Sequence, residues 1–253
     1  FTDQDDADMG NVLAQPKIVK LKIPGATASS PFTYKWFLAV ASGYNNYKTD
    51  AFTSTGSGAQ AMFFLSLDKA PSDAWALNSN YFKVVVPASS TGAANGLASP
   101  GVLLGVVGET NYLYAGDLQG NLWKFDLSNG INATKIADAV FKSAGVATPI
   151  FTATNAAGDR QPITTSPIAV EANSRGYMVV FGSGKFVEPS DTSTAGVQTI
   201  YGIWDSEETT STQFTTPKNK LFARTATEGT TSVSITTTTF AYGFNTSEYR
   251  GWF

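Results

Sequence analysis

The chain has 253 residues, of which 15% are charged and 13% aromatic, and its formal net charge is −3. It contains neither histidine nor cysteine, which excludes Ser-His-Asp and Cys-His catalytic arrangements and the usual zinc sites. Its basic residues do not cluster, so the electrostatic basis of nucleic-acid binding is missing and we expect no nucleic-acid partner. The chain starts at Phe1 without a recognisable signal peptide, and we expect it to be a piece of a longer, processed protein.

One arrangement of elements occurs three times along the chain. Each copy has a short strand led by proline, an apolar strand that ends in glycine, and a strand that ends in aspartate. The leading prolines are Pro16, Pro100 and Pro167. The apolar strands lie within Trp36–Asn46, Tyr112–Asn121 and Tyr177–Phe186, and the closing aspartates are Asp68, Asp126 and Asp205. The most regular copy is YLYAGDLQGNLWKFD at Tyr112–Asp126.

The repeat predicts an all-β fold. Its apolar strands are nearly continuous, which is typical of sheets covered on both faces. A unit of three or four strands cannot bury both faces alone, so the units are expected to stack, and sheets repeated around an axis form a β-propeller. We predict a partial, modified β-propeller of about three to four blades within a single domain. The expected units are 11–94, 95–158, 159–206 and an incomplete unit, 207–253.

These units are longer than a usual blade, so the surplus is expected in loops. Loops on rigid scaffolds are where binding residues concentrate. The candidate contact loops are Lys48–Gly58, Lys69–Ala94 and Thr209–Asn219. Lys135–Lys142 is expected to hold a short strand or helical turn, and the Thr-rich Ser232–Phe244 a strand.

Several polar motifs allow a functional and a structural interpretation. Asp117 and Asp126 flank the central hairpin and would suit an acid–base pair. Asp side chains also cap turns, and because similar residues end the strands of the other copies, we favour capping. Gly182–Lys185 resembles a phosphate loop but lacks its spacing, so a hairpin turn is favoured. Trp123 is expected to be a buried structural ring, with Trp36 and Trp204 in similar roles.

Three segments carry a family resemblance, and they occur in the family's order. They are YAGDLQGNLWKFDLS at Tyr114–Ser128, YMVVFGSGKFVEPSD at Tyr177–Asp191 and TIYGIWDS at Thr199–Ser206. Together with QPKIVKL near the start and RGWF at the end, they resemble the C-terminal domain of the PilC/PilY family. The resemblance implies a modified β-propeller in a type IV pilus-associated surface protein, active in pilus biogenesis and in adhesion at the pilus tip.

The resemblance also carries expectations about partners and location. It implies minor pilins and the pilus tip complex (fimbrium) as partners, with a host-cell receptor or glycan as a further target in virulence. It implies a cell-surface location at the pilus tip, either outer membrane-associated or extracellular. It implies no enzymatic activity, so we expect neither catalytic residues nor a cofactor.

Many members of the family carry a calcium loop just before the Tyr-Ala-Gly-Asp strand. The matching positions here are Leu103, Gly105, Val107 and Asn111. Only Asn111 has a side-chain oxygen to offer, and calcium needs several. We therefore expect a metal-free loop at this position, replaced by a tight apolar turn or a strand.

The acidic opening of the chain offers a second candidate metal site. Asp3, Asp5 and Asp8, with Asp6 between them, have the alternation that a calcium loop uses. Terminal segments are more often solvated and mobile, and we favour that interpretation.

Two further functions stay open on the sequence. One is a periplasmic quinoprotein-like dehydrogenase, which would need a calcium-bound quinone and an acid–base carboxylate. The other is a lectin-like module that binds glycans by stacking sugars on exposed aromatic rings.

Overall fold

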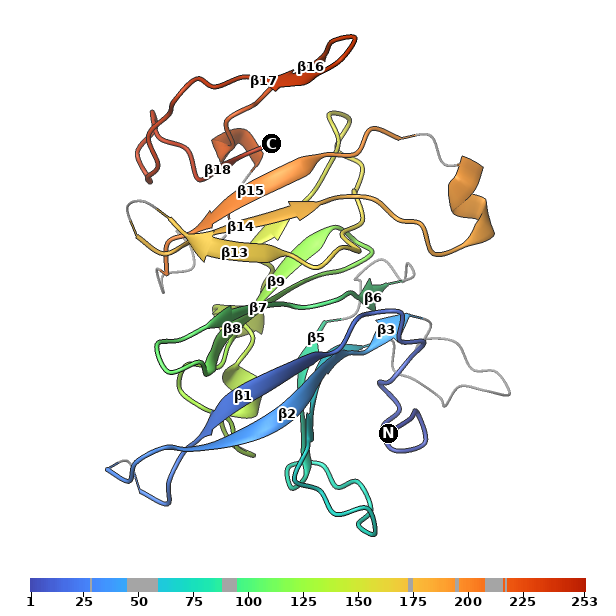
Figure 1. Ribbon diagram of the computed structural model, residues 1–253, viewed down its shortest axis with the longest axis vertical. Coiled ribbons are helices and arrows are strands. Elements are labelled where there is room, and N and C mark those ends of the chain that lie inside the picture. Colours follow the sequence, from blue (N-terminus) through green and yellow to red (C-terminus); the bar gives the residue numbers. More distant parts are fainter. Residues whose placement is uncertain are drawn as a thin grey trace.

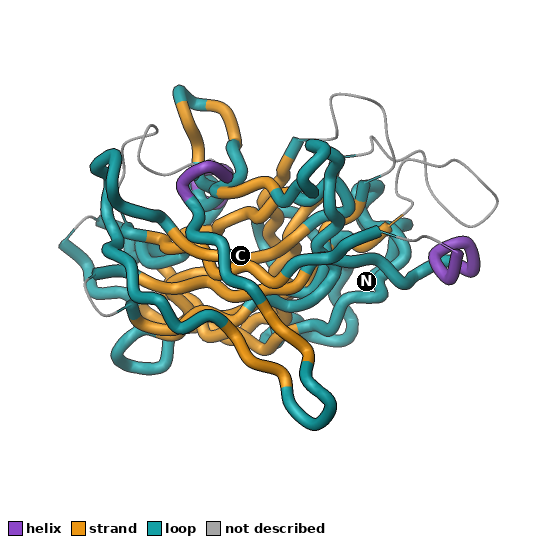
Figure 2. Tube along the Cα trace, turned by 90° about the horizontal axis from the view of Figure 1, so that it is seen from above, coloured by secondary structure: helices purple, strands orange, loops and turns teal. Residues whose placement is uncertain are grey.

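Three four-stranded antiparallel sheets make up most of the molecule and follow one another along its long axis (Figure 1). The computed structural model describes residues 1–27, 29–44, 59–87, 95–172, 175–193, 196–207, 216 and 218–253. Seen from above, the strands fill the middle and the loops surround them (Figure 2). The predicted all-β class is confirmed. Among the described residues no helix is long and apolar enough to cross a membrane.

Within each sheet the strands lie side by side in chain order. The first sheet holds β1 (Lys17–Ile23), β2 (Thr33–Ala41), β4 (Gln60–Ser66) and β5 (Tyr81–Val86). The second holds β7 (Gly101–Leu104), β8 (Thr110–Gly116), β9 (Asn121–Asp126) and β12 (Phe151–Thr152). The third holds β13 (Ile168–Glu171), β14 (Tyr177–Gly182), β15 (Ile200–Asp205) and β18 (Gly251–Trp252).

The remaining elements are short. They are β3 (Gly43–Tyr44) with β6 (Gly96–Leu97), β10 (Lys142–Ser143) with β11 (Val146–Ala147), β16 (Ala226–Glu228) with β17 (Val233–Ile235), and the 3-10 helices η1 (Ile136–Asp138), η2 (Pro189–Ser193) and η3 (Lys218–Lys220). Helix η1 confirms the helical turn predicted in Lys135–Lys142. Of the strand predicted over Ser232–Phe244, only β17 forms.

The first strands of the three sheets start side by side. Each of them directly follows the proline that leads its copy of the repeat, as predicted. The Gln15 N–H donates to Ser99 Oγ at 2.9 Å, and Ser166 Oγ donates to the Pro100 carbonyl at 2.9 Å. The residue before each proline thus joins its sheet to a neighbouring one.

The second sheet is covered on both faces because side chains alternate along its strands. On β8, Leu113 and Ala115 belong to the core shared with the first sheet, which includes Phe37. The intervening Tyr114 belongs to the core shared with the third sheet, which includes Tyr201. The stacking inferred from the apolar strands is therefore present.

The outer faces of the end sheets are covered by the rest of the chain. The segment before β1 lies on the first sheet, where Met9 packs beside Val40 and Phe63. At the other end of the molecule, the segment after β15 lies beyond the third sheet (Figure 1) and places Tyr242 and Phe244 against Trp204, with ring centres 6.0 and 5.4 Å away.

The chain's last strand joins the third sheet. β18 pairs with β15, with Trp252 opposite Gly202, and a side chain at residue 202 would lie 2.3 Å from the Trp252 ring. The predicted incomplete unit 207–253 therefore gives its final strand to the preceding sheet. The other predicted unit boundaries stay predictions.

The close approach of the second and third sheets at Gly101 can be tested directly. A Cβ at this residue would lie 1.9 Å from the Pro167 carbonyl oxygen, which belongs to backbone and cannot rotate away. We expect Gly101→Ala to lower the free energy of unfolding by about 2 kcal/mol or more in urea titration.

Gly182→Ala is the matched control. A Cβ there meets nothing within 4 Å, so the change should alter stability by less than about 1 kcal/mol. Equal effects of the two substitutions would contradict the close approach of these sheets.

Candidate functional site

Asp117 sits at the turn between β8 and β9, where it is fully buried. Its Oδ1 accepts the backbone N–H groups of Gln119 and Asn121, both at 2.9 Å. Its Oδ2 accepts Asn121 Nδ2 and Trp123 Nε1, both at 2.9 Å, and Asn95 Nδ2 at 3.3 Å. One carboxylate thus fixes the turn and orients the buried Trp123 ring, as the capping interpretation predicts.

Asp126 lies at the opposite end of the same hairpin. Its Oδ1 accepts the Ser128 backbone N–H at 2.9 Å and the Ser128 hydroxyl at 2.6 Å. Because Asp117 follows β8 and Asp126 ends β9, the structure does not bring the two carboxylates together as an acid–base pair.

A buried polar network crosses the seam between the second and third sheets. Lys124 Nζ lies 2.6 Å from Asp205 Oδ2, and both side chains are at most 5% exposed. The same oxygen accepts the Tyr114 hydroxyl at 2.6 Å. Burial, reinforced by the Asp205 charge, raises the pKa of Tyr114 well above its usual range, so the phenol stays a donor.

Sequence analysis missed this network. The sequence predicted Asp205 only as the end of a strand, whereas its side chain is buried, and nearby Glu207 Oε1 accepts the Tyr112 hydroxyl at 2.9 Å. The available signal was a lysine among the apolar residues of β9, at Lys124, and an aspartate that ends the apolar strand β15, at Asp205.

At the position where the resemblance implies a calcium loop, the chain forms a strand end and a tight turn. β7 runs to Leu104, and the Gly105 N–H donates to the Glu109 carbonyl at 2.6 Å to close the turn. Leu103, Gly105 and Val107 offer no side-chain oxygen, and Asn111 Oδ1 already accepts Lys22 Nζ at 3.4 Å. These residues do not fit a calcium ion, whereas the expected apolar turn is present.

The acidic opening is packed in the structure, which differs from the solvated, mobile end favoured on the sequence. Asp6 and Asp8 lie 2.8 and 2.7 Å from Lys83 Nζ. Asp5 Oδ2 accepts the Thr2 N–H at 2.7 Å. The candidates Asp3, Asp5 and Asp8 do not converge, since no metal-binding group of three acidic residues occurs in the described ranges.

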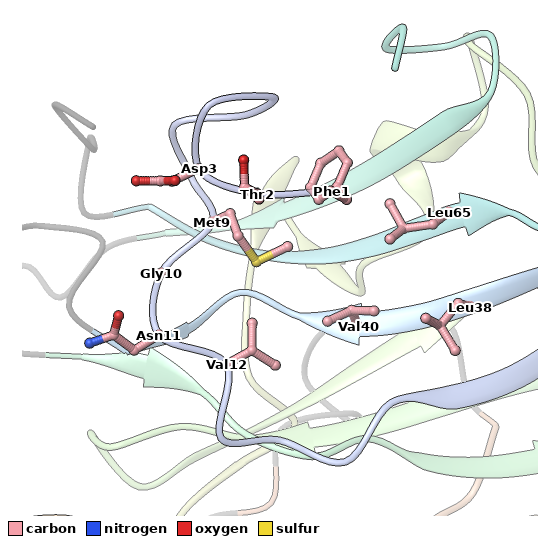
Figure 3. A pocket seen from close by; sticks show the side chains of 10 residues that line it. All are labelled: Phe1, Thr2, Asp3, Met9, Gly10, Asn11, Val12, Leu38, Val40 and Leu65. Carbon is pink, nitrogen blue, oxygen red and sulfur yellow. The ribbon is translucent and has the colours of Figure 1, made fainter. Parts of the chain in front are cut away.

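A cavity of about 550 Å³ lies between this opening segment and the first sheet (Figure 3). Apolar side chains line most of it. The segment contributes Phe1, Met9 and Val12, and the sheet contributes Leu38, Val40 and Leu65. Thr2, Asp3 and Asn11 are the polar side chains among its lining residues. The apolar side chains of Phe1, Met9 and Val12 thus place this segment against the first sheet.

An exposed aromatic row runs along the start of β2. It consists of Phe32, Tyr34 and Trp36, which are 44%, 42% and 51% exposed. Lys20 Nζ lies 4.7 Å from the centre of the Tyr34 ring. The predicted burial of Trp36 is wrong, because the register places residue 36 opposite Lys20, on the face turned away from the second sheet.

Gly182–Lys185 begins a long connection and is not the hairpin turn that was favoured. Seventeen residues separate β14 from β15, and they include η2. Lys185 Nζ pairs with Asp191 Oδ1 at 3.0 Å, and Asp191 Oδ2 accepts the N–H groups of Val187 and Glu188 at 2.8 and 2.9 Å. Lys185 thus forms an ion pair within the connection between β14 and β15.

The candidate contact loops are placed only in part. Lys48–Gly58 lies outside the described residues, as does most of Thr209–Asn219. Of Lys69–Ala94, residues 69–87 are described, and the loop before β5 is mostly exposed, although Trp75 packs on Tyr81 at 6.5 Å between ring centres. The aromatic row lies outside all three predicted loops, although the alternation of rings at 32, 34 and 36 was visible in the sequence.

Comparison with known proteins points to one family. A family model described as the PilY1 beta-propeller domain matches residues 6–238. The type IV pilus biogenesis factor PilY1 of Pseudomonas aeruginosa strain UCBPP-PA14 is 29% identical over 248 residues, which cover 90% of this chain and 19% of that protein. A PilY1 homolog of Xylella fastidiosa is 40% identical over 99 residues, which cover 39% of this chain and 7% of that protein.

A solved structure gives the same indication. The crystal structure of the P. aeruginosa PilY1 C-terminal domain superimposes with a TM-score of 0.67 at 25% identity. The match covers 98% of this chain and 51% of that one. The chain thus spans about half of the solved domain and about a fifth or less of the curated relatives' length.

The hydrogen bonds of Asp117 predict that its substitution lowers the free energy of unfolding strongly. Asp117→Ala removes the acceptor for several buried N–H groups, and we expect the free energy of unfolding to fall by about 3 kcal/mol. Asp126→Ala, at the exposed end of the hairpin, should cost about 1 kcal/mol or less. Tryptophan fluorescence during urea unfolding measures both losses, and similar values would contradict the role assigned to Asp117.

The interactions of Asp191 in the connection after β14 predict a pH-dependent contribution to the free energy of unfolding. The N–H groups of Val187 and Glu188 and the Lys185 ammonium hold the pKa of Asp191 below its usual range, against the opposing effect of burial. A lowered folded-state pKa adds stability above the unfolded pKa of about 3.9, and this is lost as the pH falls through the folded value.

We therefore expect Asp191→Asn to destabilise the chain at neutral pH, with a difference from the wild type that shrinks below about pH 4. Thermal unfolding at a series of pH values measures it. A difference that stays constant down to the acid limit would contradict this account.

Proposed function

The chain belongs to the PilY1 β-propeller family, and on this premise we propose that it is a binding domain of a type IV pilus-associated surface protein. Membership confirms the resemblance seen in the sequence and the propeller type of fold, here represented by three four-stranded sheets among the described residues. The homologues are type IV pilus biogenesis factors, and a pilus-related location follows from them.

The observation that carries the proposal is the exposed aromatic row on the first sheet, whose other face packs on the second sheet. Tyr and Trp are enriched at protein interfaces because large rings bury much area while losing little conformational entropy. Tyr34 and Trp36 keep about half of their surface exposed on regular β structure. A partner that covers these two rings buries their apolar surface without a change in the conformation of the sheet.

The proposed partners are minor pilins and other components of the pilus tip, with adhesion to a host-cell receptor as the finer role. We propose a non-enzymatic mechanism. Three carboxylates at the hairpin and the seam accept hydrogen bonds that stabilise the fold, and they belong to Asp117, Asp126 and Asp205. We therefore assign them structural roles.

The aromatic row also supports a second candidate function, which is glycan binding. Exposed rings on a flat strand suit stacking against the apolar faces of sugars, and Lys20 beside Tyr34 adds a hydrogen-bond donor. A glycan array probed with the chain tests this. Binding of a defined glycan that Trp36→Ala abolishes supports it, and an empty array rejects it.

Pull-down from piliated cells tests the main proposal. The tagged chain is expected to recover pilus-tip components, and Tyr34→Ala with Trp36→Ala should reduce recovery about tenfold or more, as loss of interface hot spots does. Phe186→Ala is the matched control, because this ring is 78% exposed but lies on the connection after β14.

The control variant should bind like the wild type, and unchanged thermal unfolding of all variants shows that folding is intact. Recovery of tip components that is equal for the double variant and the wild type would reject the aromatic row as the binding surface. Failure of the wild-type chain to recover any pilus component would reject the proposed function.

A further inference from the structure

The Lys22 ammonium is surrounded by oxygen atoms of the second sheet. Its Nζ lies 3.2 Å from Glu109 Oε1 and 3.4 Å from Asn111 Oδ1, and it donates to the Ser128 carbonyl at 3.1 Å. The Lys22 and Glu109 side chains are only 16% and 7% exposed. The ammonium of a β1 residue is thus held in a largely buried site formed by the β7–β8 turn, a residue of β8 and the loop after β9.

Glu109 connects this cation to the turn between β7 and β8. Its Oε2 accepts the Val107 N–H at 3.0 Å, while its backbone carbonyl accepts the Gly105 N–H at 2.6 Å. Lys20, two residues before Lys22, donates to the Val107 carbonyl at 3.0 Å. The turn is therefore closed by a carboxylate whose charge is balanced by an ammonium from the other sheet.

The same turn lies where the family resemblance implies a calcium loop. Its residues, however, do not provide the ligands that a calcium ion needs. A calcium ion takes about six to eight oxygen ligands. Leu103, Gly105 and Val107 supply none from their side chains, and a side chain at residue 105 would meet Glu109 Oε1 at 2.5 Å. The oxygens that remain already surround an ammonium.

We infer that the Lys22 ammonium supplies, at this turn, the positive charge that a bound metal ion would otherwise supply. It neutralises Glu109, holds the turn closed, and makes this region of the chain independent of divalent cations. Because Lys22 belongs to β1, the ammonium also ties the turn to the first sheet, and the Lys22 carbonyl accepts the Ile131 N–H at 2.9 Å on the same seam. This inference does not depend on the proposed binding function.

The first test compares thermal unfolding of the 253-residue chain in millimolar CaCl2 and in EGTA. The inference predicts the same Tm in both. A Tm that rises with CaCl2, returns with EGTA, and loses this response in Glu109→Gln would show a metal site at the turn and overturn the inference.

The second test removes the ammonium. Lys22→Met leaves the Glu109 charge without its partner, and we expect Tm to fall by about 5–10 °C in both solutions. Lys35→Met is the matched control on the same sheet, because Lys35 pairs with Asp68 at 3.8 Å on the exposed surface and should leave Tm within about 2 °C. Equal Tm values for Lys22→Met and wild type would overturn the inference.

Hydrogen exchange gives a local readout that also serves if Lys22→Met folds poorly. In Glu109→Gln, which keeps the size of the side chain, amides 105–111 should exchange at least about tenfold faster, with β14 unchanged. Exchange at 105–111 that is as slow as in the wild type would contradict the role assigned to the Lys22–Glu109 pair.

Discussion

Burial of the second sheet on both faces is the constraint on which the rest of the structure depends. Alternation along β8 sends Leu113 and Ala115 toward the first sheet and Tyr114 toward the third. A four-stranded sheet with two apolar faces is stable only between two neighbours, so the three sheets have to form as a stack. The end sheets have one neighbour each, and the segments before β1 and after β15 cover their outer faces.

Among the described residues, each seam combines apolar packing with a buried ion pair. Lys22 of the first sheet meets Glu109 of the second, and Lys124 of the second meets Asp205 of the third. Such pairs add little net stability, because desolvation offsets their attraction, but separating the partners leaves a charge buried. They therefore favour one placement of neighbouring sheets, and this fixed placement is what a rigid binding surface requires.

Local features could be predicted from the sequence, and features that depend on neighbouring sheets could not. The proline-led strands and the Asp117 turn follow from residues close together in the chain. Partners such as Lys124 and Asp205 are 81 positions apart, and their pairing depends on how the sheets stack. The exposure of Trp36 depends on the β1–β2 register, which composition does not determine.

Native-state hydrogen exchange across a denaturant series tests the central claim, that the stacked sheets are one cooperative unit. If neither face of the second sheet can be exposed alone, the slowest amides of β2, β8 and β14 should open with the same free energy and the same denaturant dependence. One sheet that opens at a distinctly lower free energy while the other two stay protected would contradict the account.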